Sequence, residues 1–265
     1  MAESESGTGS EKIIVSGDGK KIFLLYPHSV IREEMLDTLL INGFETYTLF
    51  DDKRAVKIFE RFPGSIAFIN IDEGLPEYEW ETYIKSLMKD PKTMDTMIGI
   101  MSYNQDKALM EKYLMDIAVH CGYIQLKLGL QQSKPIILNA LHATEARGRR
   151  KFIRAFCHND TSATMNFKSE KGIIKGQLLD ISSAGIAVRC PGFPDLPANS
   201  LLRQVQFKLH GSILMADLVL MGKRKEDPNT LIMLFVPAAM KPEQKMIVYR
   251  FIKYTLQKYI DSMVI

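Results

Sequence analysis

Hydrophobic and polar positions follow one pattern before about residue 144 and another after it. Between residues 21 and 143, short apolar runs alternate with amphipathic stretches of helical length. The amphipathic stretches predict helices, the first with Ser29 as its N-cap and the last beginning near Ser133. The apolar runs predict five buried strands, at residues 21–26, 46–50, 65–71, 97–102 and 124–128. The helices between and after them are expected at residues 29–40, 52–62, 78–88, 107–120 and 133–142. Such β-α units predict an α/β domain with a parallel sheet covered by helices on both faces.

In residues 144–265 the apolar runs follow one another without helices between them. Six such runs, separated by turn residues, predict an antiparallel six-stranded β-barrel. The predicted strands are residues 163–167, 173–181, 185–190, 201–209, 213–222 and 231–236. An amphipathic helix is expected from Pro242 onward, with Met246, Ile247, Phe251 and Ile260 on its apolar face. Residues 1–20 are polar and rich in acidic and small residues, and they predict a disordered tail.

The composition and charge of the chain limit the classes of function that it can have. The chain has 265 residues, 25% of them charged, but a net charge of only +3, so any anion binding must be local. No apolar stretch has the length of a transmembrane helix. Three cysteines, Cys121, Cys157 and Cys190, lie far apart, and the histidines are scattered. We therefore expect no metal site, no disulfide and no cofactor, and a reducing cytoplasm as the location.

Positive charge is concentrated where the two patterns meet. Between Arg147 and Arg154, five of eight residues are Arg or Lys and none is acidic. Arg150 and Arg154 form an RxxxR motif. Further on, the turn between two predicted strands reads DISSAG, which places Asp180, Ser182 and Gly185 in a DxSxxG pattern.

These two motifs, in this order and at the start of an all-β segment, resemble the PilZ domain. That family is a six-stranded barrel that binds the bacterial second messenger cyclic di-GMP. The resemblance covers roughly residues 147–262. It implies a bacterial receptor or effector in signalling, for example of motility, which acts on a downstream protein that the sequence does not identify. It also implies that the ligand is bound by Arg150, Arg154, Asp180, Ser182 and Gly185.

The chemistry of these residues suits that ligand. The planar fork of arginine bonds both to phosphate oxygens and to the O6/N7 edge of guanine, and it can stack on a base. Asp180 can accept from the N1–H and 2-amino edge of guanine, and Ser182 can donate or accept nearby. Gly185 is expected to let backbone approach the ligand. Since Arg149 directly precedes the motif, the resemblance further implies an intercalated pair of ligand molecules.

The α/β part resembles a response-regulator receiver domain. Asp72 follows the third predicted strand at the position of the phosphoacceptor, and Ser102 and Lys127 end the fourth and fifth strands. The acidic pair that holds Mg²⁺ in receivers is replaced by Tyr26 and Pro27, which offer no carboxylate. We therefore expect a pseudo-receiver, with Asp72 as a loop or helix-capping acid and no response to beryllofluoride with Mg²⁺.

Other interpretations remain open from the sequence alone. An Arg-rich run after a helix can simply complement the helix C-terminus, and Asp, Ser and Gly are ordinary turn residues. The alternative function is a nucleic-acid-binding regulator that uses the same basic segment. No nucleophile motif, acid pair or cofactor fingerprint is present, so we predict a receptor and not an enzyme. The connector is expected to be mobile without ligand and ordered by it.

Overall fold

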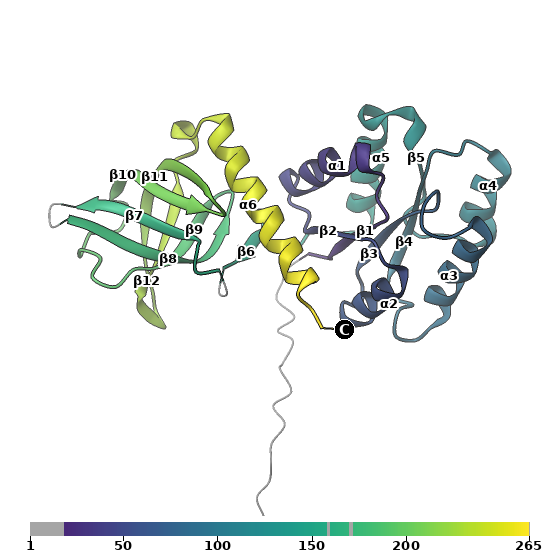
Figure 1. Cartoon of the computed structure of the whole chain (residues 1–265), viewed down its shortest axis with the longest axis horizontal. Helices are drawn as coiled ribbons and strands as arrows, with labels where there is room; N and C mark the ends of the chain where they lie inside the picture. Colours follow the sequence, from purple (N-terminus) through teal and green to yellow (C-terminus); the bar gives the residue numbers. More distant parts are fainter. Residues whose placement is uncertain (1–18, 158–159, 170–171, 265) are drawn as a thin grey trace, which may run out of the picture.

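The computed structural model describes residues 19–157, 160–169 and 172–264. Most of the predicted N-terminal tail lies outside these described residues. The chain forms an α/β domain and a β-barrel, with the C-terminal helix α6 (Pro242–Asp261) between them (Figure 1). The predicted fold class is confirmed in both parts.

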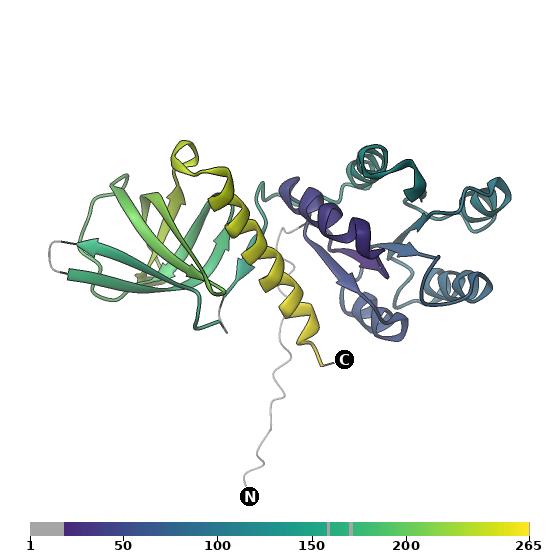
Figure 2. The ribbon, with the colours of Figure 1, turned by 45° about the horizontal axis from the view of Figure 1, so that its top comes forward.

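The α/β domain is built on a five-stranded parallel sheet with the order β2-β1-β3-β4-β5. Alternate side chains of β1 point to opposite faces of the sheet. Ile22 and Leu24 pack with helices α1 and α5, whereas Phe23 and Leu25 pack with α2 and α3. Both faces are therefore covered, as Figure 2 shows. The strands are β1 (Ile22–Leu25), β2 (Thr46–Leu49), β3 (Ile66–Asn70), β4 (Met97–Ser102) and β5 (Tyr123–Gln125). The helices are α1 (Ser29–Ile41), α2 (Asp52–Arg61), α3 (Glu77–Lys89), α4 (Lys107–Glu111) and α5 (Leu130–Ala143).

Three predicted boundaries in this domain were wrong. The helix predicted at 107–120 is α4 followed by a π-helical turn (Lys112–Asp116), and the chain then turns at Ala118, whose φ of 57° is incompatible with a helix. The strand predicted at 124–128 ends early because Leu126–Leu128 form a 3₁₀ turn. Helix α1 is capped by His28, whose side chain accepts from the Val30 N–H, and not by Ser29.

The barrel closes in the order β8-β7-β10-β11-β12-β9, with β9 pairing back onto β8, and all its pairings are antiparallel. Its interior is filled by alternating apolar side chains such as Phe207, Leu218 and Met233, none of which is exposed. A further strand, β6 (Arg154–Phe156), pairs with β8 outside the closed ring. The barrel strands are β7 (Thr164–Ser169), β8 (Gly172–Ser182), β9 (Gly185–Arg189), β10 (Leu201–Leu209), β11 (Ser212–Arg224) and β12 (Asp227–Phe235).

Helix α6 binds both domains. Its apolar face, including Phe251 and Ile252, is buried in a core continuous with that of the barrel. On its other side, the Gln257 amide completes the exposed edge of β2: Thr48 N–H donates to Gln257 Oε1 at 2.9 Å, and Gln257 Nε2 donates to Thr48 O at 3.0 Å. The edge strand thus gains a side-chain partner in place of another strand.

An ion-pair cluster and a helix-end contact extend this attachment. Lys253 Nζ of α6 donates to Glu33 Oε2 at 2.8 Å and to Asp37 Oδ1 at 2.7 Å, both on α1. Arg54 of α2 donates to the Ile260 carbonyl oxygen at 2.8 Å, near the C-terminus of α6. These contacts hold the α/β domain against α6.

Candidate functional site

The short pairing of β6 with β8 brings the two sequence motifs together. In the antiparallel register Arg154 lies opposite Ser182, and Phe156 lies opposite Asp180. Because opposite residues project from the same face, Arg154 and the two motif residues of β8 share one surface. The motifs are 26 positions apart in the sequence, counting from Arg154 to Asp180, but are direct neighbours in the fold.

A β-bulge sets which way the DxSxxG residues face. The register between β8 and β9 shifts between Leu178 and Asp180, so that Leu178 and Ile181 are both fully buried in the barrel core. Asp180 and Ser182, which flank Ile181, consequently project to the outside. Without the extra residue, Asp180 would share the inward face with Leu178.

Asp180 lies between two guanidinium groups. Arg154 Nη1 is 4.0 Å from Asp180 Oδ1, and Arg224 Nη2 is 3.6 Å from Oδ2. The aspartate side chain is 8% exposed, whereas those of Arg154 and Arg224 are 46% and 38% exposed. Both distances are longer than a hydrogen bond, so each arginine keeps N–H donors that can serve another acceptor. Sequence reasoning missed Arg224, because no motif spacing links the end of β11 to Asp180.

Ser182 and Gly185 shape the turn between β8 and β9. Ser182 Oγ accepts from the Gly185 N–H at 3.2 Å and from the Ala184 N–H at 3.3 Å. A Cβ on Gly185 would lie 2.2 Å from the Met233 carbonyl oxygen of β12. Glycine is therefore required here by the close approach of two strands, and the approach of a ligand to this backbone stays a prediction.

The connector before β6 is attached to the α/β domain. The Lys20 N–H donates to the Ala146 carbonyl oxygen at 2.9 Å, and Arg147 Nη2 donates to the Asn42 carbonyl oxygen at 2.6 Å. Arg149 and Arg150, which follow, are both exposed. The basic segment therefore starts on one domain and ends, at Arg154, on the other.

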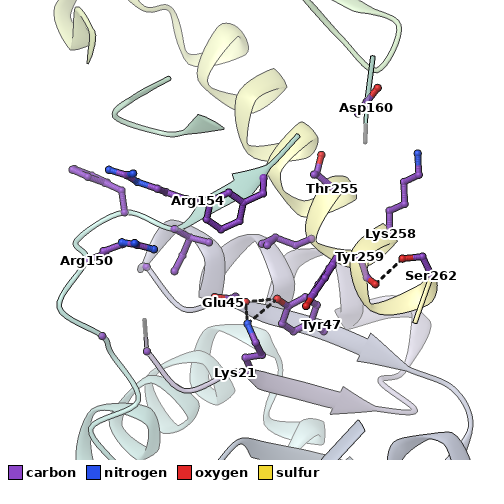
Figure 3. Close-up of a pocket in the computed structure, with 17 residues that line it drawn as sticks. Lys21, Glu45, Tyr47, Arg150, Arg154, Asp160, Thr255, Lys258, Tyr259 and Ser262 are labelled. Carbon is purple, nitrogen blue, oxygen red and sulfur yellow. Dashed lines mark hydrogen bonds and ion pairs between the residues drawn. The ribbon is translucent and has the colours of Figure 1, made fainter. Parts of the chain in front are cut away.

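A cleft of about 570 Å³ lies between the domains, and both arginines of the RxxxR motif line it. In Figure 3, Arg150 and Arg154 lie on one side, and Lys21, Glu45 and Tyr47 of the α/β domain lie on another. Helix α6 adds Thr255, Lys258 and Tyr259, and Ser262 follows at the C-cap of the helix. The volume is in the range of small-molecule sites.

The six predicted ligand-binding residues thus occupy adjoining positions and not one cavity. Arg150 and Arg154 line the cleft, and Arg154 also adjoins Asp180. Ser182 is next to Asp180 on the same strand face, Gly185 begins β9, and Arg149 is exposed on the connector. Arg154 is the residue that joins the cleft to the barrel surface.

Of the three residues that suggested a receiver, Asp72 and Ser102 contact each other. Ser102 Oγ donates to Asp72 Oδ1 and the Tyr103 N–H donates to Oδ2, both at 2.6 Å. Helix α3 has Pro76 as its N-cap and no side-chain cap, so Asp72 joins the ends of β3 and β4 and caps no helix. Lys127 is exposed and has no ion pair within the described part of the chain.

The three cysteines are buried as free thiols. Cys121, Cys157 and Cys190 are free and buried, and burial raises the pKa of each, to about 11, 12 and 11 respectively. For Cys157, the charges of nearby Asp160 and Asp180 contribute to this rise in pKa after burial, and the group stays a thiol at neutral pH. In residues 19–157, 160–169 and 172–264, no cluster of His, Cys, Asp and Glu could hold a metal ion. The described helices include none with the length and apolarity needed to cross a membrane.

Known proteins resemble the chain in structure only. No protein-family model matches the sequence, and no curated protein matches it. A solved PilZ domain of YcgR from Escherichia coli with c-di-GMP matches 43% of the chain and 99% of its own length, at 16% identity and a TM-score of 0.34. A K. pneumonia MrkH–c-di-GMP complex matches 40% of the chain (16% identity, TM-score 0.32), and the Bacillus subtilis inhibitor of motility MotI/DgrA matches 43% (14%, 0.33). The chain spans about half the length of these last two proteins, 51% and 53%.

Proposed function

We propose that the chain is a non-enzymatic receptor for cyclic di-GMP. The observation that carries this proposal is the position of Arg154, which lines the interdomain cleft with Arg150 and adjoins the buried Asp180 on the barrel. A ligand with two phosphates and two guanines can use a cationic cleft and an acidic acceptor at once. The RxxxR and DxSxxG motifs resemble those of PilZ domains, and this resemblance implies cyclic di-GMP, which has both phosphates and guanines.

In this proposal each motif residue has a distinct task. Arg150 and Arg154 bind phosphate oxygens and guanine edges, and Asp180 accepts from the N–H edge of a guanine. Ser182 donates to or accepts from the ligand nearby, and Gly185 lets backbone approach the ligand. Arg149 stacks on a second, intercalated ligand molecule.

Ligand binding would then act on the arrangement of the domains. The connector is joined to the α/β domain through Arg147 and Lys20, so ordering it against the barrel restricts that domain as well. A ligand that prefers one arrangement shifts the population toward it. We infer that a downstream protein in the bacterial cytoplasm recognises this arrangement, with the pseudo-receiver as a contact surface and not as a phosphoacceptor.

Titration calorimetry with cyclic di-GMP tests the proposal. We expect saturable binding by the wild-type protein and a loss of affinity in Arg150→Ala. A folded protein that gives no heat and no competition at physiological salt would refute the proposal.

Asp180→Ala separates the receptor from a nucleic-acid-binding regulator. Loss of the carboxylate should weaken cyclic di-GMP binding, whereas binding to DNA through phosphates would be unchanged or stronger. DNA binding whose affinity falls steeply with salt, without cyclic di-GMP binding, would favour the regulator instead.

A further inference from the structure

The wall of the cleft opposite the RxxxR arginines carries a carboxylate with a free oxygen. Glu45 lies just before β2, and its side chain is 13% exposed. Lys21 Nζ and the Tyr47 hydroxyl both donate to Glu45 Oε1. Within the described part of the chain, no donor reaches Oε2. The carboxylate is thus held in position by two hydrogen bonds, and its other oxygen can accept a hydrogen bond from a ligand.

The cleft is therefore polarised. Arg150 and Arg154 supply positive charge on one side, whereas Glu45 on the other side is paired with Lys21, so that this pair has no net charge. The two phosphodiester groups of a cyclic dinucleotide carry one negative charge each and belong on the arginine side, since a carboxylate repels them. What suits the Glu45 side is a neutral group with N–H donors.

An aromatic ring from α6 adds a flat apolar surface to the same wall. Tyr259 lines the cleft and is 52% exposed, although large aromatic side chains are usually more buried. In Figure 3 its side chain projects from α6 toward the α/β domain, where Tyr47 and Glu45 lie. An exposed tyrosine ring beside a hydrogen-bonding carboxylate is a suitable surface for stacking a nucleobase.

We propose that Glu45 and Tyr259 form a guanine-reading subsite, so that the α/β domain and α6 contribute directly to ligand specificity. Glu45 Oε2 accepts from the N1–H or 2-amino group of guanine, and Tyr259 stacks on the base. Adenine offers only its 6-amino group next to the N1 lone pair, which the carboxylate repels. The proposal rests on cyclic di-GMP being the ligand, and it places residues outside both motifs in the binding site.

The test compares Glu45→Gln and Tyr259→Ala with matched controls in titrations of cyclic di-GMP, using cyclic di-AMP as the competitor. Glu33→Gln also removes a carboxylate paired with a lysine between the domains, but outside the cleft. Tyr254→Ala removes another partly exposed tyrosine of α6 that does not line the cleft. Thermal unfolding of all four variants accounts for changes in stability.

We expect Glu45→Gln to weaken cyclic di-GMP binding by roughly 10- to 100-fold, the worth of a charge-assisted hydrogen bond, and to reduce the preference over cyclic di-AMP. Tyr259→Ala should weaken both ligands by roughly tenfold. If wild type binds and Arg150→Ala does not, but the two variants match their controls, the subsite is refuted and the receptor function stands. If wild type itself does not bind, the receptor function and the subsite both fail.

Discussion

Replacing Arg154 with alanine should separate binding from stability. Its guanidinium lines the cleft and lies 4.0 Å from Asp180. The substitution removes a proposed phosphate or guanine contact and one of the two cations beside a buried carboxylate. The two losses differ greatly in free energy.

The loss of stability should be small. The Arg154 side chain is 46% exposed, and an ion pair at such a position contributes at most about 1 kcal/mol. Asp180 also keeps Arg224 at 3.6 Å, so it is not left as an unpaired buried charge. A protein of this size should then lose no more than about 4 °C in Tm. Truncating one partner of a charge-assisted contact to a bound ligand costs about 2–5 kcal/mol, or roughly 30- to 5,000-fold in Kd.

Titration calorimetry and thermal unfolding of the same preparations provide the comparison. Arg189→Ala is the matched control, because Arg189 also pairs with an aspartate on the barrel, Asp227 at 3.4 Å, but does not line the cleft. Both variants should unfold close to the wild-type temperature, and only Arg154→Ala should lose affinity. Equal affinities for the two variants, or a loss of affinity that follows a large loss of stability, would show that Arg154 does not contact the ligand.

Three further predictions concern stoichiometry, pH and the connector. Calorimetry should give two cyclic di-GMP molecules per chain for wild type and one for Arg149→Ala. A ratio of one for both proteins would exclude the intercalated pair. The hydrogen bond from Lys253 lowers the pKa of Glu33 below its ordinary 4.5, so this contact stabilises the folded protein above that pH and the stabilisation is lost as the pH falls through the lowered value. Thermal unfolding between about pH 7 and about pH 3 should therefore show that Glu33→Gln loses less stability on acidification than the wild-type protein does. Parallel curves of Tm against pH for the two proteins would contradict this assignment. Hydrogen exchange over residues 147–157 should slow when cyclic di-GMP is added. Backbone amides that are already fully protected without ligand would show instead that the connector is rigid.

The local pattern of apolar and polar residues was sufficient to predict most of the fold. The six barrel strands and the five sheet strands were predicted because burial imposes apolar runs or alternation that a single segment reveals. Strand β6 has only three residues, too few for a period, and it was missed. The early end of the helix at 107–120 was missed because the helical apolar pattern continues past the π-turn to Ala118.

The candidate site was only partly predictable, for a different reason. The motif residues were identified by their spacing, and β6–β8 pairing brings Arg154 beside Ser182. Arg224 and Glu45 have no spacing relation to those motifs, and they reach the site only through barrel closure and domain docking. The amphipathic pattern of α6 indicated a buried face, but it could not indicate that Gln257 binds the edge of β2. Long-range partners of this kind depend on tertiary packing.

A crystal structure of the full chain grown with cyclic di-GMP would show directly whether the ligand binds between the two domains. We expect ligand density in the cleft between Arg150, Arg154 and Glu45, with a phosphate on the arginine side and a guanine edge reaching Asp180 or Glu45. Ligand bound elsewhere on the barrel, or crystals at saturating ligand with an empty cleft, would contradict this expectation.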